Sequence, residues 1–112
     1  MIAGLASAAL LAAAPQLAGL YEINQMEMAG GLELRPDGRF RYAFDYGAVS
    51  EEAQGNWVAE GDNVVLTTDP MPPPSECDRG FATACFKGTR LTNEGGNLIL
   101  LRWDARIILR RD

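Results

Sequence analysis

Few side chains in this sequence could support acid–base or nucleophilic chemistry, and they are scattered along it. Ser50 and Ser75 are candidate nucleophiles, but the sequence has no histidine to activate a hydroxyl, and its single lysine, Lys87, is distant from both. Glu51 and Glu52 are adjacent and point to opposite faces of a strand. The remaining candidate carboxylates are Glu22 and Glu27. We therefore expect a solvated acidic surface and no enzymatic activity, with an uncharacterised hydrolase as the remote alternative.

Sulfur-bearing residues offer two further kinds of chemistry. Met26, Met28 and Met71 together would form a thioether set for Cu(I), because soft sulfur ligands suit that ion; alternatively, one methionine fills the core and another lies at its rim. Cys77 and Cys85 are the only cysteines, with seven residues between them. A redox pair usually has two intervening residues, so we expect a structural disulfide in an exported chain. No cofactor is predicted, and the methionines are the only metal alternative.

Aromatic residues occupy every second position from residue 40 to residue 46, and charged or small residues lie between them. This period of two predicts a strand with all four rings on one face. In a barrel the inward faces of the strands converge, so these rings and the two tryptophans could line an apolar cavity. The candidate ligand-binding residues are Tyr42, Phe44, Tyr46, Trp57 and Trp103. The alternative is that the rings fill the interior, as side chains usually do in a small barrel.

Length and charge restrict the class of protein further. The chain has 112 residues, enough for one domain with a modest core, and a net charge of −5. Its nine arginines are scattered, which argues against nucleic-acid binding, because phosphate recognition needs a clustered basic surface. The absence of histidine excludes histidine-based triads and histidine ligation of zinc or haem.

The N-terminal segment predicts export. Residues 1–14 are apolar, rich in alanine and uncharged, and they end in three alanines before Pro15. The apolar run is shorter than the roughly 20 residues that a membrane span needs. We therefore expect a signal peptide over residues 1–14, a linker over residues 15–18 and a secreted or periplasmic mature chain without a membrane span. A buried N-terminal helix of the domain is the alternative.

The rest of the chain reads as short strands separated by turn residues, without a helical period. The clearest turn is Pro36-Asp37-Gly38, where proline presets φ, aspartate bonds the nearby backbone and glycine supplies a positive φ. We expect a turn at residues 29–31, a loose connection over residues 47–52 and a surface loop rich in proline over residues 69–85. The expected strands cover residues 19–28, 32–35, 39–46, 53–59, 64–68, 86–92, 98–103 and 106–111. About eight short strands at this spacing predict an all-β, antiparallel, up-and-down barrel or sandwich over residues 19–112.

Part of this pattern resembles small secreted bacterial lipocalin-like proteins of the calycin type. The residues that carry the resemblance are Gly19-Leu20-Tyr21-Glu22, Leu34-x-x-Asp37-Gly38-x-Phe40-x-Tyr42, Gly55-x-Trp57 and Gly61-x-x-Val64-x-Leu66-Thr67. In lipocalins an arginine of the last strand packs over the aromatic ring that opens the first strand. The resemblance therefore implies a compact barrel in which Arg106 or Arg110 packs over Tyr21.

Together these observations predict a non-catalytic envelope protein, a monomer or weak dimer, that binds a small apolar ligand or an envelope partner. A Cu(I)-handling protein that uses the three methionines is the alternative. A large cavity lined by the rings would favour the ligand, whereas a filled interior would favour the partner.

Overall fold

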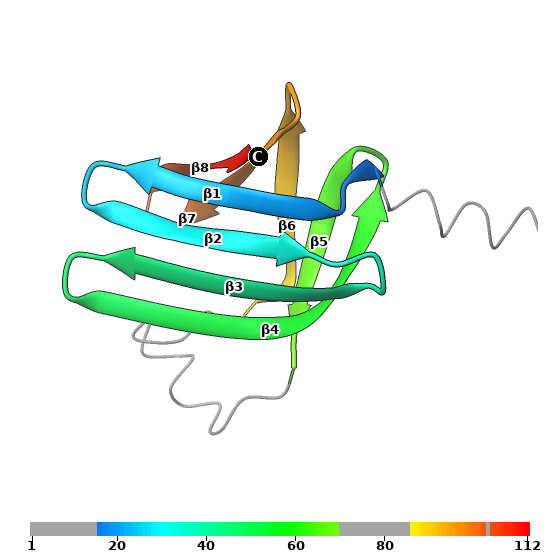
Figure 1. Ribbon diagram of the computed structural model, residues 1–112, viewed down its shortest axis with the longest axis horizontal. Helices are drawn as coiled ribbons and strands as arrows, with labels where there is room; N and C mark the ends of the chain where they lie inside the picture. Colours follow the sequence, from blue (N-terminus) through cyan, green and yellow to red (C-terminus); the bar gives the residue numbers. More distant parts are fainter. Residues whose placement is uncertain (1–15, 70–85, 103) are drawn as a thin grey trace, which may run out of the picture.

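The computed structural model describes residues 16–69, 86–102 and 104–112, which form a closed antiparallel barrel (Figure 1). Every strand pairs with the next one along the chain, and β8 returns to β1, which confirms the predicted all-β meander and decides for a barrel over a sandwich. The strands are β1 (Gly19–Gln25), β2 (Met28–Leu34), β3 (Arg39–Tyr46), β4 (Val49–Glu60), β5 (Asn63–Thr68), β6 (Lys87–Glu94), β7 (Asn97–Arg102) and β8 (Ala105–Arg111).

Two predicted segments lie outside the described residues. They are the signal peptide over residues 1–14 and nearly all of the proline-rich loop that holds Cys77 and Cys85. In the described part of the chain, no helix is long and apolar enough to cross a membrane.

The turn between β2 and β3 forms as its sequence predicts. The Gly38 amide donates to the Arg35 carbonyl at 3.0 Å, and Gly38 has a φ of 89°. The Asp37 carboxylate accepts a hydrogen bond from the Arg39 amide at 3.0 Å. These local bonds fix the register of the hairpin, so that Leu34 pairs with Phe40.

Alternation along β3 divides its side chains between the interior and the surface. Phe40, Tyr42 and Phe44 are buried, whereas Arg41 and Asp45 are exposed. β7 departs from this alternation, because Leu98, Ile99 and Leu100 are all buried. One apolar core occupies the interior of the barrel. The largest fully buried side chains are Tyr21, Phe40, Phe44, Ile23, Leu32, Leu34, Leu66, Leu91, Leu98, Leu100, Ile107 and Leu109.

The first reversal of the chain differs from the prediction. The turn between β1 and β2 lies at Met26–Glu27, with a φ of 62° at Glu27, and not at residues 29–31. Gly30 is instead inside β2, where an added Cβ would lie 2.2 Å from the carbonyl oxygen of Ala43. The glycine therefore allows a close approach of two backbones and does not reverse the chain.

The predicted loose connection over residues 47–52 is also wrong. β4 begins at Val49, directly after a tight turn at Gly47–Ala48, and its twelve residues pair first with β3 and then with β5. At the change of partner stands Gly55, where an added Cβ would lie 2.1 Å from the Thr67 carbonyl oxygen. The extra strand length matters for the site, because it places residues 50–52 in the barrel wall.

The two ends of the barrel are named here by their turns. The Gly47 end carries the turns at residues 26–27 and 47–48 and the connection from β7 to β8, and the Gly61 end carries the turns at residues 35–38, 61–62 and 95–96. In Figure 1 the Gly47 end of β1 to β4 lies at the left, and β5 and β6 run steeply across these four strands.

Candidate functional site

The predicted ligand-binding rings do not form one site. Tyr42, Phe44 and Trp57 point into the barrel and are buried. Tyr46 lies at the Gly47 end and is 37% exposed. Trp103 lies outside the described residues.

The buried rings pack against one another. The Tyr42 ring lies 6.0 Å from Phe44 and meets the edge of Phe86 at 5.1 Å between centroids. The Trp57 indole donates a hydrogen bond to the Arg35 carbonyl at 2.8 Å. These contacts place Tyr42, Phe44 and Trp57 in the packed core. They favour the alternative stated from the sequence, in which the rings fill the interior of the barrel.

A buried ion pair joins opposite walls of the barrel. Glu51, on β4, accepts two hydrogen bonds from the Arg102 guanidinium, on β7, at 2.5 and 3.0 Å. The Glu51 side chain is fully covered, and that of Arg102 is 17% exposed. The expectation that Glu51 belongs to a solvated acidic surface is therefore wrong, whereas Glu52 is exposed on the outer face.

An aromatic ring lies beside this pair. The Arg102 guanidinium lies 5.9 Å from the Phe86 ring centroid, in reach of a cation–π attraction. Burial lowers the pKa of Arg102, but the hydrogen bonds and the charge of Glu51 outweigh it and raise that pKa above its usual value. The Arg102 guanidinium thus stays charged, and its partner inside the otherwise apolar barrel is the Glu51 carboxylate.

The hydroxyl of Tyr42 lies beside the pair. It is buried and has no hydrogen-bond partner of normal geometry among the described residues. Burial, and then the negative charge of Glu51, raise the pKa of Tyr42 far above its usual value, although the nearby Arg102 guanidinium opposes both effects. The hydroxyl therefore stays protonated, and a guanidinium cannot accept its proton.

The sequence carries a signal for this polar cluster that the strand assignment missed. On β4, Glu51 is in phase with the inward residues Ala53, Gly55 and Trp57, and the strand starts early enough to include it. A charged residue at an inward position predicts a buried partner.

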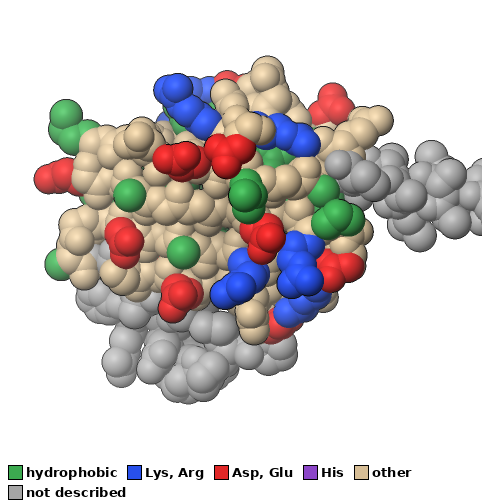
Figure 2. All heavy atoms as spheres, viewed as in Figure 1, with side chains coloured by type: hydrophobic (Ala, Val, Ile, Leu, Met, Phe, Trp, Pro, Cys, Tyr) green, Lys and Arg blue, Asp and Glu red, His purple; other side chains and the backbone are tan. Residues whose placement is uncertain are grey.

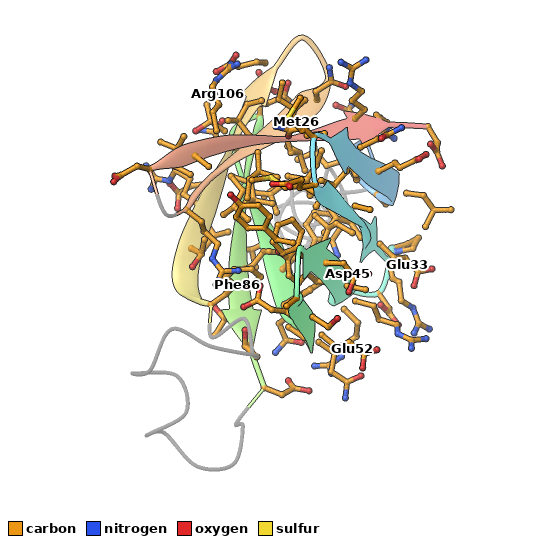
Figure 3. The ribbon with its side chains drawn as sticks, turned by 90° about the vertical axis from the view of Figure 1, so that its left-hand side faces the viewer. Met26, Glu33, Asp45, Glu52, Phe86 and Arg106 are labelled. Carbon is orange, nitrogen blue, oxygen red and sulfur yellow. The ribbon has the colours of Figure 1, made fainter. Side chains whose placement is uncertain are left out.

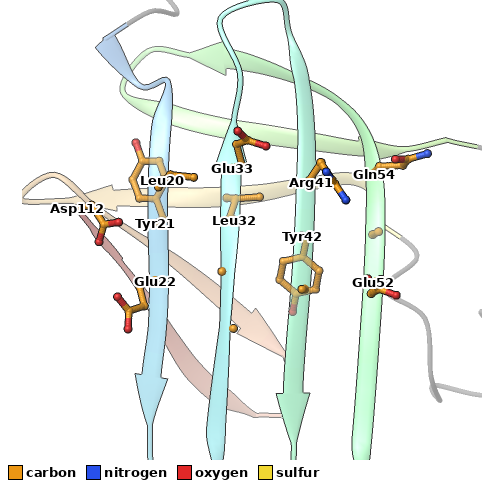
Figure 4. Close-up of a pocket in the computed structure, with 14 residues that line it drawn as sticks. Leu20, Tyr21, Glu22, Leu32, Glu33, Arg41, Tyr42, Glu52, Gln54 and Asp112 are labelled. Carbon is orange, nitrogen blue, oxygen red and sulfur yellow. The ribbon is translucent and has the colours of Figure 1, made fainter.

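A hollow lies on the outside of the barrel, over β1 to β4. It has a volume of about 640 Å³ and is open to solvent (Figure 4). One row of cross-strand partners explains it: Glu22, Gly31, Ala43 and Glu52 lie side by side on successive strands. The small residues of the two central strands form a floor, and the carboxylates of the outer strands form its two walls.

The outer groove, as we call this hollow, is acidic. Its lining includes four carboxylates and one guanidinium, which gives a net charge of −3. The charged members are Glu22, Glu33, Glu52, Asp112 and Arg41. Figure 2 shows acidic side chains spaced across this face, and Figure 3 shows Glu33 and Glu52 pointing away from the barrel.

The sulfur ligands predicted for Cu(I) are not brought together among the described residues. Met26 is 89% exposed at the tip of the hairpin between β1 and β2, whereas Met28 is buried. Met71 lies outside the described residues, as do the cysteines of the predicted disulfide. Within the described ranges, no group of three Cys, Asp or Glu side chains is placed to hold a metal ion.

An arginine of the last strand does pack over the first aromatic residue, but it is a different arginine from those predicted. The Arg111 guanidinium lies 5.5 Å from the Tyr21 ring centroid and donates to the Gln16 and Ala18 carbonyls at 2.6 and 2.8 Å. Arg106 instead forms an exposed ion pair with Glu94. Arg110 is exposed and pairs in register with Glu22.

Comparison with known proteins gives no relative. No family of sequences matches the chain, and no curated protein or solved structure matches it either.

Proposed function

We propose that this chain is a non-catalytic, lipocalin-like binding protein of the envelope or extracellular space, and that it binds a basic, extended segment of a partner protein in the outer groove. The observation that carries the proposal is the acidic groove over β1 to β4, with its floor of Gly31 and Ala43. The packed interior supports a partner at the surface over an apolar ligand inside.

The dimensions of the groove fit one extended chain. Glu22 and Glu52 stand three strands apart, a distance of about 14 Å at the usual spacing between strands. An extended segment laid between them meets small residues below and carboxylates on both sides. A lysine or arginine at every second position would place its charges along those walls.

The lipocalin-like assignment and the location rest on other features. Two features support the lipocalin-like assignment: the barrel connects each strand to its neighbour, and Arg111 packs over Tyr21. The apolar residues 1–14 support export. Export is tested by the mass of the protein recovered from the periplasm or medium, which should lack about the first 14 residues.

Binding is tested with a labelled peptide of ten alternating lysine and alanine residues, followed by fluorescence anisotropy. The variant Ala43→Arg fills the floor of the groove and adds a positive charge there, and it should weaken binding by about tenfold or more. The matched control is Val58→Arg, which adds the same charge to an exposed position of β4 that does not line the groove.

The control variant should bind the peptide like the wild-type protein, and a glutamate–alanine peptide should not bind. If both arginine variants weaken peptide binding equally, binding depends only on the net charge of the protein and not on the groove. That result, or an absence of peptide binding at low salt, would refute the proposal.

A further inference from the structure

The side chains that line the outer groove are arranged in two rows. Cross-strand pairing places the outward residues of β1 to β4 side by side, so that each row takes one residue from each strand. The upper row in Figure 4, nearer the Gly61 end, consists of Leu20, Glu33, Arg41 and Gln54 and is called the Arg41 row. The lower row consists of Glu22, Gly31, Ala43 and Glu52 and is called the Glu22 row.

The two rows differ in charge. In the Glu22 row both charged members are carboxylates, one at each end of the row. In the Arg41 row, Glu33 on β2 is followed by the guanidinium of Arg41 on β3 and by the neutral amide of Gln54 on β4. Arg41 and Gln54 are both exposed. Over β3 and β4 the lining therefore changes from acidic at Glu52 to basic at Arg41 within one step from row to row.

This step matches the repeat of an extended chain. The two rows occupy alternate residues of the same strands, so they lie about 7 Å apart. In an extended segment laid along these strands, side chains on one face are also two residues and about 7 Å apart. A basic side chain beside Glu52 therefore brings the residue two positions further along the segment to Arg41. A second basic residue there would be repelled, whereas a carboxylate would be attracted and could accept paired hydrogen bonds.

We propose that Arg41 sets the register of the bound segment by pairing with an acidic residue two positions beyond the last basic one. The inference rests on the proposed function, because it assigns a charge pattern to the segment that the outer groove would bind. The partner segment is then a run of alternating basic residues that ends in an acidic residue, and not a uniformly basic tail. The Glu22 row supplies the attraction, and Arg41 disfavours segments that would place a positive charge beside it.

A double-mutant cycle in the binding assay tests this pairing. Two labelled peptides with blocked termini carry lysine and alanine in alternation, and both ends of the peptide are glutamate in one and glutamine in the other. Glutamate at both ends makes the result independent of the direction in which the segment lies. Each peptide is titrated against the wild-type protein and against Arg41→Gln by fluorescence anisotropy. The substitution should weaken binding of the glutamate peptide, relative to the glutamine peptide, by about threefold or more.

The matched control is Arg90→Gln, which removes the same charge from an exposed position of β6 outside the groove lining. It should change the affinities of the two peptides by nearly the same factor. An unchanged affinity ratio in Arg41→Gln, or the same change in Arg90→Gln, would overturn the inference and leave peptide binding by the groove intact. If neither peptide binds the wild-type protein at low salt, the proposed function and this inference fail together.

Discussion

The pair of Glu51 and Arg102 makes a quantitative prediction about stability, because its two members differ in burial. Removing one partner of a buried pair costs about 3–5 kcal/mol, since the other charge is left uncompensated. In Glu51→Gln the remaining charge is that of Arg102, which is 17% exposed and can turn towards water. We therefore expect a loss at the lower end, about 3 kcal/mol.

Replacing Arg102 instead leaves the fully buried Glu51 carboxylate without its partner. In Arg102→Met the Glu51 side chain has no route to solvent, so the free energy of unfolding should fall further. We therefore expect a loss towards the upper end of the range, about 4 kcal/mol. The double variant Glu51→Leu with Arg102→Met leaves no buried charge and should return to within about 1 kcal/mol of the wild-type protein.

Equilibrium urea unfolding, followed by the fluorescence of buried Trp57, measures these differences. A loss of 3 kcal/mol should also lower the melting temperature by about 10–20 °C. The control is Arg90→Ala, which breaks an exposed ion pair with Glu60 and should cost less than about 1 kcal/mol. Losses below 1 kcal/mol in both single variants, or a double variant less stable than either, would refute this account of the buried pair.

Three further predictions concern single positions. Tyr42→Phe removes a buried hydroxyl whose proton has no acceptor in the described structure, so urea unfolding at pH 7 should show no loss of stability or a gain of up to about 1 kcal/mol. Burial, and then the charge of Glu51, raise the pKa of Tyr42 above its unfolded value of 10.0, so wild-type stability should decline as the pH rises above about 10, and less so in the phenylalanine variant. Gly55→Ala drives a methyl group against the Thr67 carbonyl and should cost about 2–3 kcal/mol in the same unfolding assay. Arg111→Ala removes the cation over Tyr21 and should cost about 1–3 kcal/mol by urea unfolding, with faster amide exchange at the Gly61 end.

The parts of the fold that the sequence predicted are those controlled by neighbours along the chain. The ring spacing over residues 40–46 requires a strand, and the turn at residues 35–38 is closed by its own side chain and glycine. The turn at residues 60–63 likewise forms where Gly61 supplies a positive φ. Each of these features is decided within a few residues, so pattern and turn chemistry suffice.

The errors arose where distant contacts decide the conformation. Gly30 and Gly31 have the composition of a turn, but they lie within β2. The carbonyl oxygen of Ala43, on the next strand, occupies the space where a side chain at Gly30 would lie. Glu51 looks like surface, but a guanidinium from β7 pairs with it. The arginine over Tyr21 is Arg111, because the register between β1 and β8 places these two opposite each other.

The sequence by itself determined the class of structure, since alternating apolar and polar residues allow only one kind of buried surface in a strand. The tertiary structure decided how these strands close on one another, and thereby which charges meet inside and which line the groove outside. The local pattern of apolar and polar residues decides which side chains face inward. Which side chain lies opposite another depends on strand register and barrel closure, because these arise from pairings between residues far apart in the chain.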